Sequence, residues 1–253
     1  MSIFADEQYL TDMRNYDLGF ISNECIFNHV KDTVALYRTH INLSEFNKNI
    51  IDPIKLTFDA KIYGKSLDEI IESECIRQID KTNTNHIGYF HQNLFRYAGN
   101  GWVIPETGFD VINDELHIYA ELKNKHNTMN SRAADSVYRH MQNKILHDDK
   151  ATCMLVEVIA TKSRNDKWFY DNLSHEKIRR VSIDKFYGIV FNDELAFFKL
   201  CKALPLILDD VVSDMQRGHI RNSVYDELQN LSPDTFKSLY LLAFKTYEGF
   251  QNF

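Results

Sequence analysis

The chain has 253 residues, a net charge of −7 and an isoelectric point near 5.8. Its 44% hydrophobic and 13% aromatic content can fill a sizeable core, which excludes an intrinsically disordered chain. The acidic balance argues against a protein that attracts nucleic acid over its whole surface, although local fields matter more than the sum. No apolar run approaches the roughly 20 residues of a membrane span, so we expect no membrane segment.

The first residues, Met1–Glu7, lack the basic start and the apolar run of a signal peptide. The four cysteines are far apart in the sequence and form no CxxC pair: Cys25, Cys75, Cys153 and Cys201. This spacing supports neither a zinc site nor a disulfide framework. We therefore expect a cytoplasmic protein with reduced thiols.

The first part of the chain is predicted to be helical. Residues 22–80 are mostly helical in pattern, with helix starts at Asp52-Pro53 and after Ser66, which is a suitable N-cap. The polar run at residues 81–85 predicts a turn. Apolar side chains then recur at helical spacing until Ala98-Gly99-Asn100-Gly101, a sequence typical of a helix end.

Strands are predicted in the middle of the chain, at residues 102–105, 109–112 and 116–123. A helix over residues 131–147 and a nearly continuous apolar strand over residues 151–160 follow, and helices return from about residue 193. This order predicts an α/β fold, α+β-like in character, with a mixed central sheet flanked by helices. We expect one domain, residues 1–253: a helical part (about 1–98), a catalytic α/β core (about 99–192) and a helical C-terminal part (about 193–253).

The most informative pattern lies in residues 116–123, where apolar and polar side chains alternate as in a half-buried strand. Glu121 and Lys123 therefore share one face, and Asp110 comes from the strand before it. Two carboxylates and an ammonium in this arrangement resemble the active site of the PD-(D/E)xK nucleases. Asp110, Glu121 and the Leu122 carbonyl are expected to bind Mg²⁺, and Lys123 to act on the attacking water.

This short pattern also occurs by chance on many surface strands, where an exposed ion pair contributes roughly 0–1 kcal/mol. Two other interpretations of the pattern therefore remain: a repair or structure-specific nuclease with the same metal site, and a non-catalytic DNA-binding or interaction protein. His91 and Gln92, on the helix before the strands, are candidates for an accessory role at the site.

A polar loop follows the candidate catalytic strand and leads into the next helix. Its amide, hydroxyl and basic groups suit phosphates and base edges, so we expect a DNA-binding surface there. The candidate residues are Lys125, Asn127, Asn130, Ser131 and Arg132. The Arg179-Arg180 pair, further along the chain, is expected to contact the DNA backbone or neighbouring acids of the protein rather than bases.

Four longer stretches resemble a family of Type II restriction endonucleases that recognise the interrupted palindrome GGNCC. They are Phe46–Phe58, Asn85–Asn93, Glu121–Asn130 and Ser174–Tyr187, and the resemblance covers roughly residues 40–215. By this resemblance, Asp110, Glu121 and Lys123 fall on the family's metal and catalytic positions. Two departures are Phe109, in place of the proline of the motif, and the bulky Arg132, which would alter site preference if that turn reads bases.

The resemblance implies Mg²⁺-dependent cleavage of double-stranded DNA within GGNCC, leaving a short 5′ overhang. It also implies a bacterial restriction–modification system in which a cognate DNA methyltransferase is the partner activity. A palindromic site presents two equivalent half-sites, so we expect a C₂ homodimer with one active site for each strand.

Overall fold

The computed structural model describes residues 14–125, 129–215 and 221–244. Backbone contacts divide the chain into two compact units. Unit 1 comprises the described residues of Met1–Ala35 and Ile87–Gln216, and unit 2 those of Leu36–His86 and Arg217–Phe253. Each unit therefore combines two separate parts of the sequence and has a hydrophobic core of its own.

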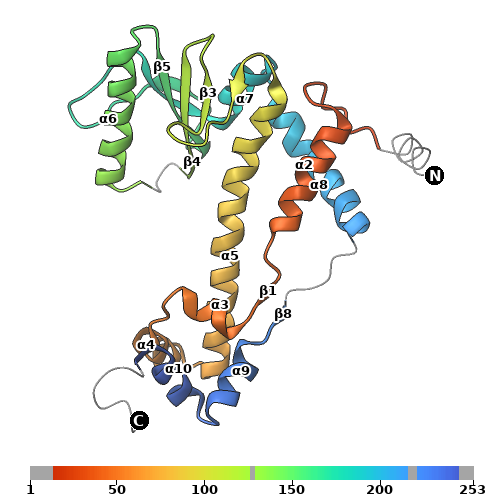
Figure 1. Cartoon of the computed structure of the whole chain (residues 1–253), viewed down its shortest axis with the longest axis vertical. Coiled ribbons are helices and arrows are strands. Elements are labelled where there is room, and N and C mark those ends of the chain that lie inside the picture. Colours follow the sequence, from red (N-terminus) through yellow and green to blue (C-terminus); the bar gives the residue numbers. More distant parts are fainter. Residues whose placement is uncertain (1–13, 126–128, 216–220, 245–253) are drawn as a thin grey trace. The chain divides into compact units, whose positions relative to one another are not determined.

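A six-stranded mixed sheet forms the centre of unit 1, in the order β2-β3-β4-β5-β7-β6 (Figure 1). The strands β4, β5 and β7 are parallel, and the other neighbours are antiparallel. The bounds are β2 (Trp102–Val103), β3 (Val111–Asn113), β4 (Ile118–Lys125), β5 (Thr152–Ile159), β6 (Asn165–Lys167) and β7 (Ile178–Ser182). This mixed sheet with flanking helices confirms the predicted fold class.

Helices cover both faces of the sheet, which explains why β5 is an almost continuous apolar run. On one face, Tyr138 and Met141 of α6 (Ser131–His147) pack in a cluster with Tyr119 and Leu155. On the other face, Val156 and other strand residues pack in a cluster with four helices. These helices are α2 (Asn23–Leu36), the end of α5 (Leu67–Leu94), α7 (Ile183–Phe191) and α8 (Ala196–Met215).

Unit 2 is mainly helical in its described part, with one short parallel strand pair, β1 (His40–Ile41) and β8 (Arg221–Asn222). Phe46, Ile71, Leu228 and Leu239 lie in its core. Its helices are α3 (Leu43–Lys48), α4 (Pro53–Tyr63), the first part of α5 (Leu67–Leu94), α9 (Val224–Leu231) and α10 (Thr235–Phe244). The unit thus joins a segment near the start of the chain to one near its end.

The turn predicted at residues 81–85 is wrong, because these residues continue α5 as a helix. The polar side chains that suggested a turn have partners instead. Asn83 accepts a hydrogen bond from the Arg38 N–H at 2.8 Å and donates one to the Arg38 carbonyl at 3.1 Å. The Thr82 hydroxyl donates to the Gln78 carbonyl at 3.0 Å. These contacts satisfy the polar groups without breaking the helix.

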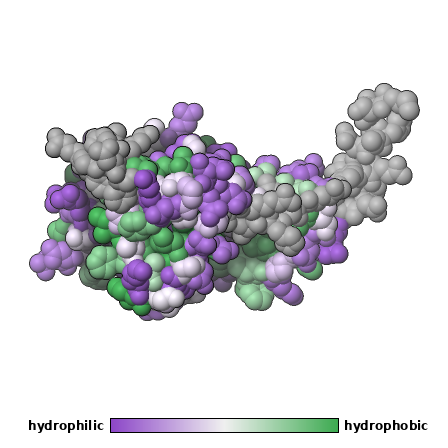
Figure 2. All heavy atoms as spheres, turned by 90° about the horizontal axis from the view of Figure 1, so that it is seen from below, coloured by the Kyte–Doolittle hydropathy of each residue, from purple (hydrophilic) through white to green (hydrophobic). Residues whose placement is uncertain are grey.

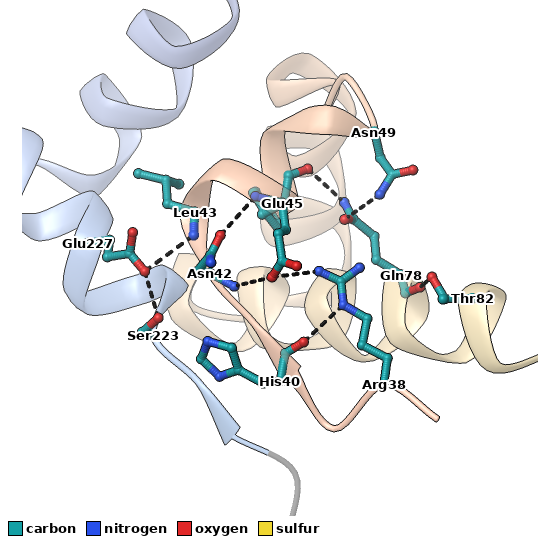
Figure 3. Close-up of polar contacts among 11 residues, drawn as sticks. Arg38, His40, Asn42, Leu43, Glu45, Asn49, Gln78, Thr82, Ser223 and Glu227 are labelled. Carbon is teal, nitrogen blue, oxygen red and sulfur yellow. Dashed lines mark hydrogen bonds and ion pairs between the residues drawn. The ribbon is translucent and has the colours of Figure 1, made fainter. Parts of the chain in front are cut away.

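The polar contacts in Figure 3 fix the start of unit 2. Asn42 and Glu45 form a reciprocal cap at the N-terminus of α3, and Glu45 also pairs with Arg38 at 2.8 Å. Glu227 of α9 accepts hydrogen bonds from the Leu43 N–H at 3.3 Å and from the Ser223 hydroxyl at 2.6 Å. This network ties the two separate segments of unit 2 together.

Some large apolar side chains remain at the surface. Figure 2 shows hydrophobic and hydrophilic residues interleaved on one face of the molecule. On α4, Ile54, Phe58 and Ile62 follow one another at four-residue spacing and are 50%, 59% and 71% exposed.

No helix in the described ranges is long and apolar enough to cross a membrane. All four cysteines are free.

We expect Asn42→Ala to lower the free energy of unfolding by about 1 kcal/mol, because it removes the oxygen that caps α3. Urea unfolding followed by circular dichroism measures the change. Lys48→Ala, at an exposed position of the same helix, is the control and should stay within about 0.5 kcal/mol of the wild type. Equal stabilities of the two variants would contradict the role of the cap.

Candidate active site

The candidate site lies on the hairpin of β3 and β4. Side chains alternate between the two faces of β4, so Glu121 and Lys123 lie on one face. Their side chains form an ion pair, with Lys123 Nζ 2.6 Å from Glu121 Oε1. Both side chains are partly buried, with 20% and 28% of their surface exposed. The pair is therefore more shielded than an ordinary surface ion pair.

Asp110 immediately precedes β3 and lies beside this pair. In the antiparallel ladder Val111 pairs with Ala120, so the next position along places Asp110 opposite Glu121. The Leu122 N–H donates a hydrogen bond of 2.7 Å to Asp110 Oδ2. This contact holds the Asp110 carboxylate against β4. The structure therefore brings Asp110, Glu121 and Lys123 together.

The charge balance of the site favours a cation. Burial, and then the negative charge of Glu121, raises the pKa of Asp110, while the Leu122 N–H and Lys123 lower it. The charge of Glu121 is thus close enough to oppose the ionisation of Asp110. A divalent cation between them would relieve this repulsion. Asp110, Glu121 and the Leu122 carbonyl offer oxygen ligands of the kind that hard divalent cations prefer.

The described residues contain no group of three or more His, Cys, Asp or Glu side chains that could hold a metal ion. The candidate ligand set is accordingly two carboxylates and one backbone carbonyl, with water for the remaining positions. Magnesium suits such a set, since it binds through one or two carboxylates and keeps several waters. Calcium sites with six to eight protein oxygens are a poorer match.

The two accessory candidates lie in different environments. Gln92 donates a hydrogen bond of 3.1 Å to the Asp110 carbonyl, so it supports the backbone of the site. His91 is buried, and its Nδ1 lies 2.9 Å from the hydroxyl of Tyr187 on α7. Burial lowers the pKa of His91 to about 4, so its ring is neutral at physiological pH. Of these two candidates, only Gln92 contacts Asp110.

The candidate DNA-binding residues follow the site along the chain. Lys125 is exposed at the end of β4, and Ser131 and Arg132 are exposed at the start of α6. Asn130 caps α6, because its Oδ1 accepts a hydrogen bond of 2.9 Å from the Ala133 N–H. Asn127 lies outside the described residues. The side-chain oxygen of Asn130 therefore already has a partner within the protein, and the helix cap explains its position without a DNA contact.

Sequence reasoning missed one charged cluster next to the site. Glu157 is fully buried on β5, where it is the register partner of Lys123 on β4. Its carboxylate pairs with Arg164 at 2.6 Å and with Arg180, whose Nε lies at 2.8 Å. The only signal in the sequence was one acid within the apolar run of residues 151–160. Arg180 thus contacts an acid, while Arg179 bonds to Asn165 at 2.5 Å.

Comparison with known proteins decides the family. The family model of the Eco47II restriction endonuclease matches residues 18–213, most of the chain. The chain belongs to this restriction endonuclease family. It is 34% identical over 215 residues to the Type II restriction enzyme Sau96I of Staphylococcus aureus, covering 78% of this chain and 82% of that enzyme. It is 29% identical over 214 residues to the Type II restriction enzyme Eco47II of Escherichia coli, covering 78% and 89%.

Membership in this family makes the protein an endonuclease of a restriction system, and DNA its substrate. The matched range contains all of β3 and β4, and with them Asp110, Glu121 and Lys123. Enzymes of this type generally use divalent metal ions, which agrees with the oxygen ligands that the hairpin presents.

Asp110→Asn should raise the melting temperature of the metal-free endonuclease near neutral pH. Because the pKa of Asp110 is raised in the folded state, its contribution to stability is largest at acid pH and is lost as the pH rises through that pKa. Asparagine removes the charge and keeps an oxygen for the Leu122 N–H. Differential scanning calorimetry in EDTA measures the shift.

The same variant should lose stabilisation by a divalent metal ion. At about 100 times the dissociation constant, the ion should stabilise the wild type by roughly 2.7 kcal/mol. Asp209→Asn, at an exposed position of α8, is the control and should respond as the wild type does. An equal metal response of Asp110→Asn and the wild type would show that Asp110 is not a ligand.

Proposed function

We propose that this endonuclease hydrolyses double-stranded DNA within the palindrome GGNCC in the presence of Mg²⁺ and leaves a short 5′ overhang. Its main support is the convergence of Asp110, Glu121 and Lys123 on one hairpin, within a chain of the Eco47II family. The GGNCC target rests on the resemblance of Glu121–Asn130 and the other stretches to GGNCC-recognising enzymes.

In this proposal Asp110, Glu121 and the Leu122 carbonyl hold Mg²⁺. When bound, the ion neutralises charge on the scissile phosphate and makes water a stronger nucleophile. Lys123, whose Nζ lies 2.6 Å from Glu121 Oε1, orients the attacking water and stabilises the negative charge that develops on the phosphate. Gln92 fixes the Asp110 backbone through its hydrogen bond to the carbonyl.

Target recognition is assigned to the segment that follows β4. Reading a G·C pair requires Arg or Lys at guanine O6 and N7, or acceptors at cytosine N4. Lys125 and Arg132 carry suitable donors, and Asn127, Asn130 and Ser131 offer polar groups for bases or phosphates. Arg132 is one of the two departures from the resembling family, so it is the residue expected to change site preference.

The palindrome also determines the assembly that we propose. Two equivalent half-sites are read by two copies of one protein related by a two-fold axis, with one active site on each strand. The system further requires a cognate DNA methyltransferase to protect host sites, with no stable complex between the two enzymes implied. Both would act on DNA in the bacterial cytoplasm.

Digestion of a sequenced plasmid tests this function. The wild type should give discrete fragments in Mg²⁺ and none in EDTA, with all ends inside GGNCC. Lys123→Ala should cut at least about 100-fold more slowly, because it removes a charge that stabilises the transition state. Lys185→Ala, an exposed lysine on α7, is the control and should cut normally.

The outcomes separate the parts of the proposal. Discrete fragments that end at another sequence would retain the active site and reject GGNCC. Metal-dependent cutting without fixed ends would indicate a structure-specific or repair nuclease. An intact plasmid with well-folded wild-type protein would favour a non-catalytic DNA-binding protein.

Sedimentation equilibrium tests the proposed assembly. The mass should approach twice the chain's 29.7 kDa at micromolar concentration, or the mass of two chains plus one duplex on addition of one GGNCC duplex per two chains. A scrambled duplex of equal length is the control. A stoichiometry of one chain per specific duplex would contradict the two-fold arrangement.

A further inference from the structure

The cluster around Glu157 stands apart from the candidate catalytic residues and has an unusual composition. A fully buried carboxylate on β5 accepts hydrogen bonds from two guanidinium groups. Glu157 Oε2 pairs with Arg164 Nη2 at 2.6 Å, and Oε1 accepts from Arg180 Nε at 2.8 Å and also from its Nη2. One negative charge thus holds two positive charges in fixed orientations.

The register of the sheet places this cluster beside Lys123. Lys123 and Glu157 are direct partners in the parallel ladder of β4 and β5, so their side chains lie on the same face. Neighbouring strands are about 4.8 Å apart, so Glu157 is one strand from the candidate catalytic lysine. Arg180 on β7 pairs with Leu155, two residues before Glu157 on the same face of β5.

The cluster begins where the apolar cover of this sheet face ends. Leu155 packs beneath α6 in the same hydrophobic cluster as Tyr138 and Met141, whereas the next position on that face of β5 is Glu157. Burying a carboxylate costs several kcal/mol, and a well-packed apolar side chain of similar size fills such a space without this cost. Core packing alone therefore gives no reason for an acid and two arginines here.

The two arginines retain access to the solvent. Their side chains are 16% (Arg164) and 27% (Arg180) exposed, while Glu157 beneath them is completely covered. Arg164 Nε is buried and donates to no group in the described part of the chain. On the β6 side, the register partner of Arg180 is Asp166, an exposed acid. Glu157 thus supports guanidinium groups that partly face outward.

We propose that Arg164 and Arg180, held by Glu157, bind a phosphate of the DNA strand that is cut, next to the phosphate at Lys123. A guanidinium fork offers two parallel donors to phosphate oxygens, and a buried acid that fixes the fork reduces the entropy lost on binding. Glu157 is accordingly a positioning residue, and the arginines are the contact residues. The inference rests on the proposed active site, because its location is defined by Lys123.

The salt dependence of DNA binding tests this inference. A labelled duplex containing GGNCC is titrated with the full-length protein in EDTA between about 50 and 200 mM salt, using fluorescence anisotropy. Arg164→Gln and Arg180→Gln should each weaken binding about tenfold or more and reduce the slope of log K against log salt by about 1. Arg→Lys at either position keeps the charge and should retain the wild-type slope.

Arg14→Gln is the matched control, because Arg14 is also paired with an acid, Asp210 of α8, at 3.5 Å. Its salt slope should equal that of the wild type. Melting temperatures of all variants are measured in parallel, because a purely structural cluster would lower stability in the Lys and Gln variants alike and leave the slope unchanged. That result in folded protein would overturn the inference.

Plasmid cleavage by the wild type separates this inference from the function on which it rests. If the wild type cuts within GGNCC while the Gln variants keep the wild-type salt slope, only the phosphate contact is rejected. If the wild type neither cuts nor binds the duplex, both are rejected. Normal cutting by the wild type together with the reduced slopes would support the contact.

Discussion

The hydrogen bond from the Leu122 N–H to Asp110 is the contact on which the candidate site depends. At 2.7 Å it takes the place that a backbone carbonyl would take if β3 extended one position further along β4. The continuation of the strand pairing thus places a carboxylate opposite Glu121. The same donor partly offsets the burial and the charge repulsion that raise the pKa of Asp110. Sheet geometry therefore supplies the position of the acid and offsets part of the rise in its pKa.

Much of this hairpin could be predicted from the sequence because the local pattern and the final environment agree. The alternation of residues 116–123 matches β4 from residue 118 onward, while residues 116–117 belong to the turn before it, and the apolar run of residues 151–160 matches β5 between two helical layers. The expected caps are also present: Asp52 accepts from the Ile54 and Lys55 N–H groups, and Ser66 pairs reciprocally with Glu69. These features are decided by neighbours within a few residues, which a sequence displays directly.

Features that depend on distant partners could not be predicted in this way. The polar run at residues 81–85 favours a turn until Arg38, 45 positions away, provides partners for Asn83. The sequence of β7 contains two adjacent arginines, which interrupt the apolar alternation expected of a strand. Their partners, Glu157 and Asn165, come from other segments of the chain. For the same reason the sequence indicated helices at both ends of the chain without showing that α3 and α9 share one core.

The arrangement of charge along one sheet face reconciles an acidic protein with an anionic substrate. At the hairpin, Asp110 and Glu121 outnumber Lys123 by one negative charge, which favours a cation. Further along the sheet, across β5 and β7, Arg164 and Arg180 outnumber Glu157 by one positive charge, which favours a phosphate. The two excess charges lie on the same face of the sheet, as the proposed metal and phosphate contacts require. Because the Debye length is about 8 Å at physiological ionic strength, these neighbours outweigh the net charge of −7 spread over the molecule.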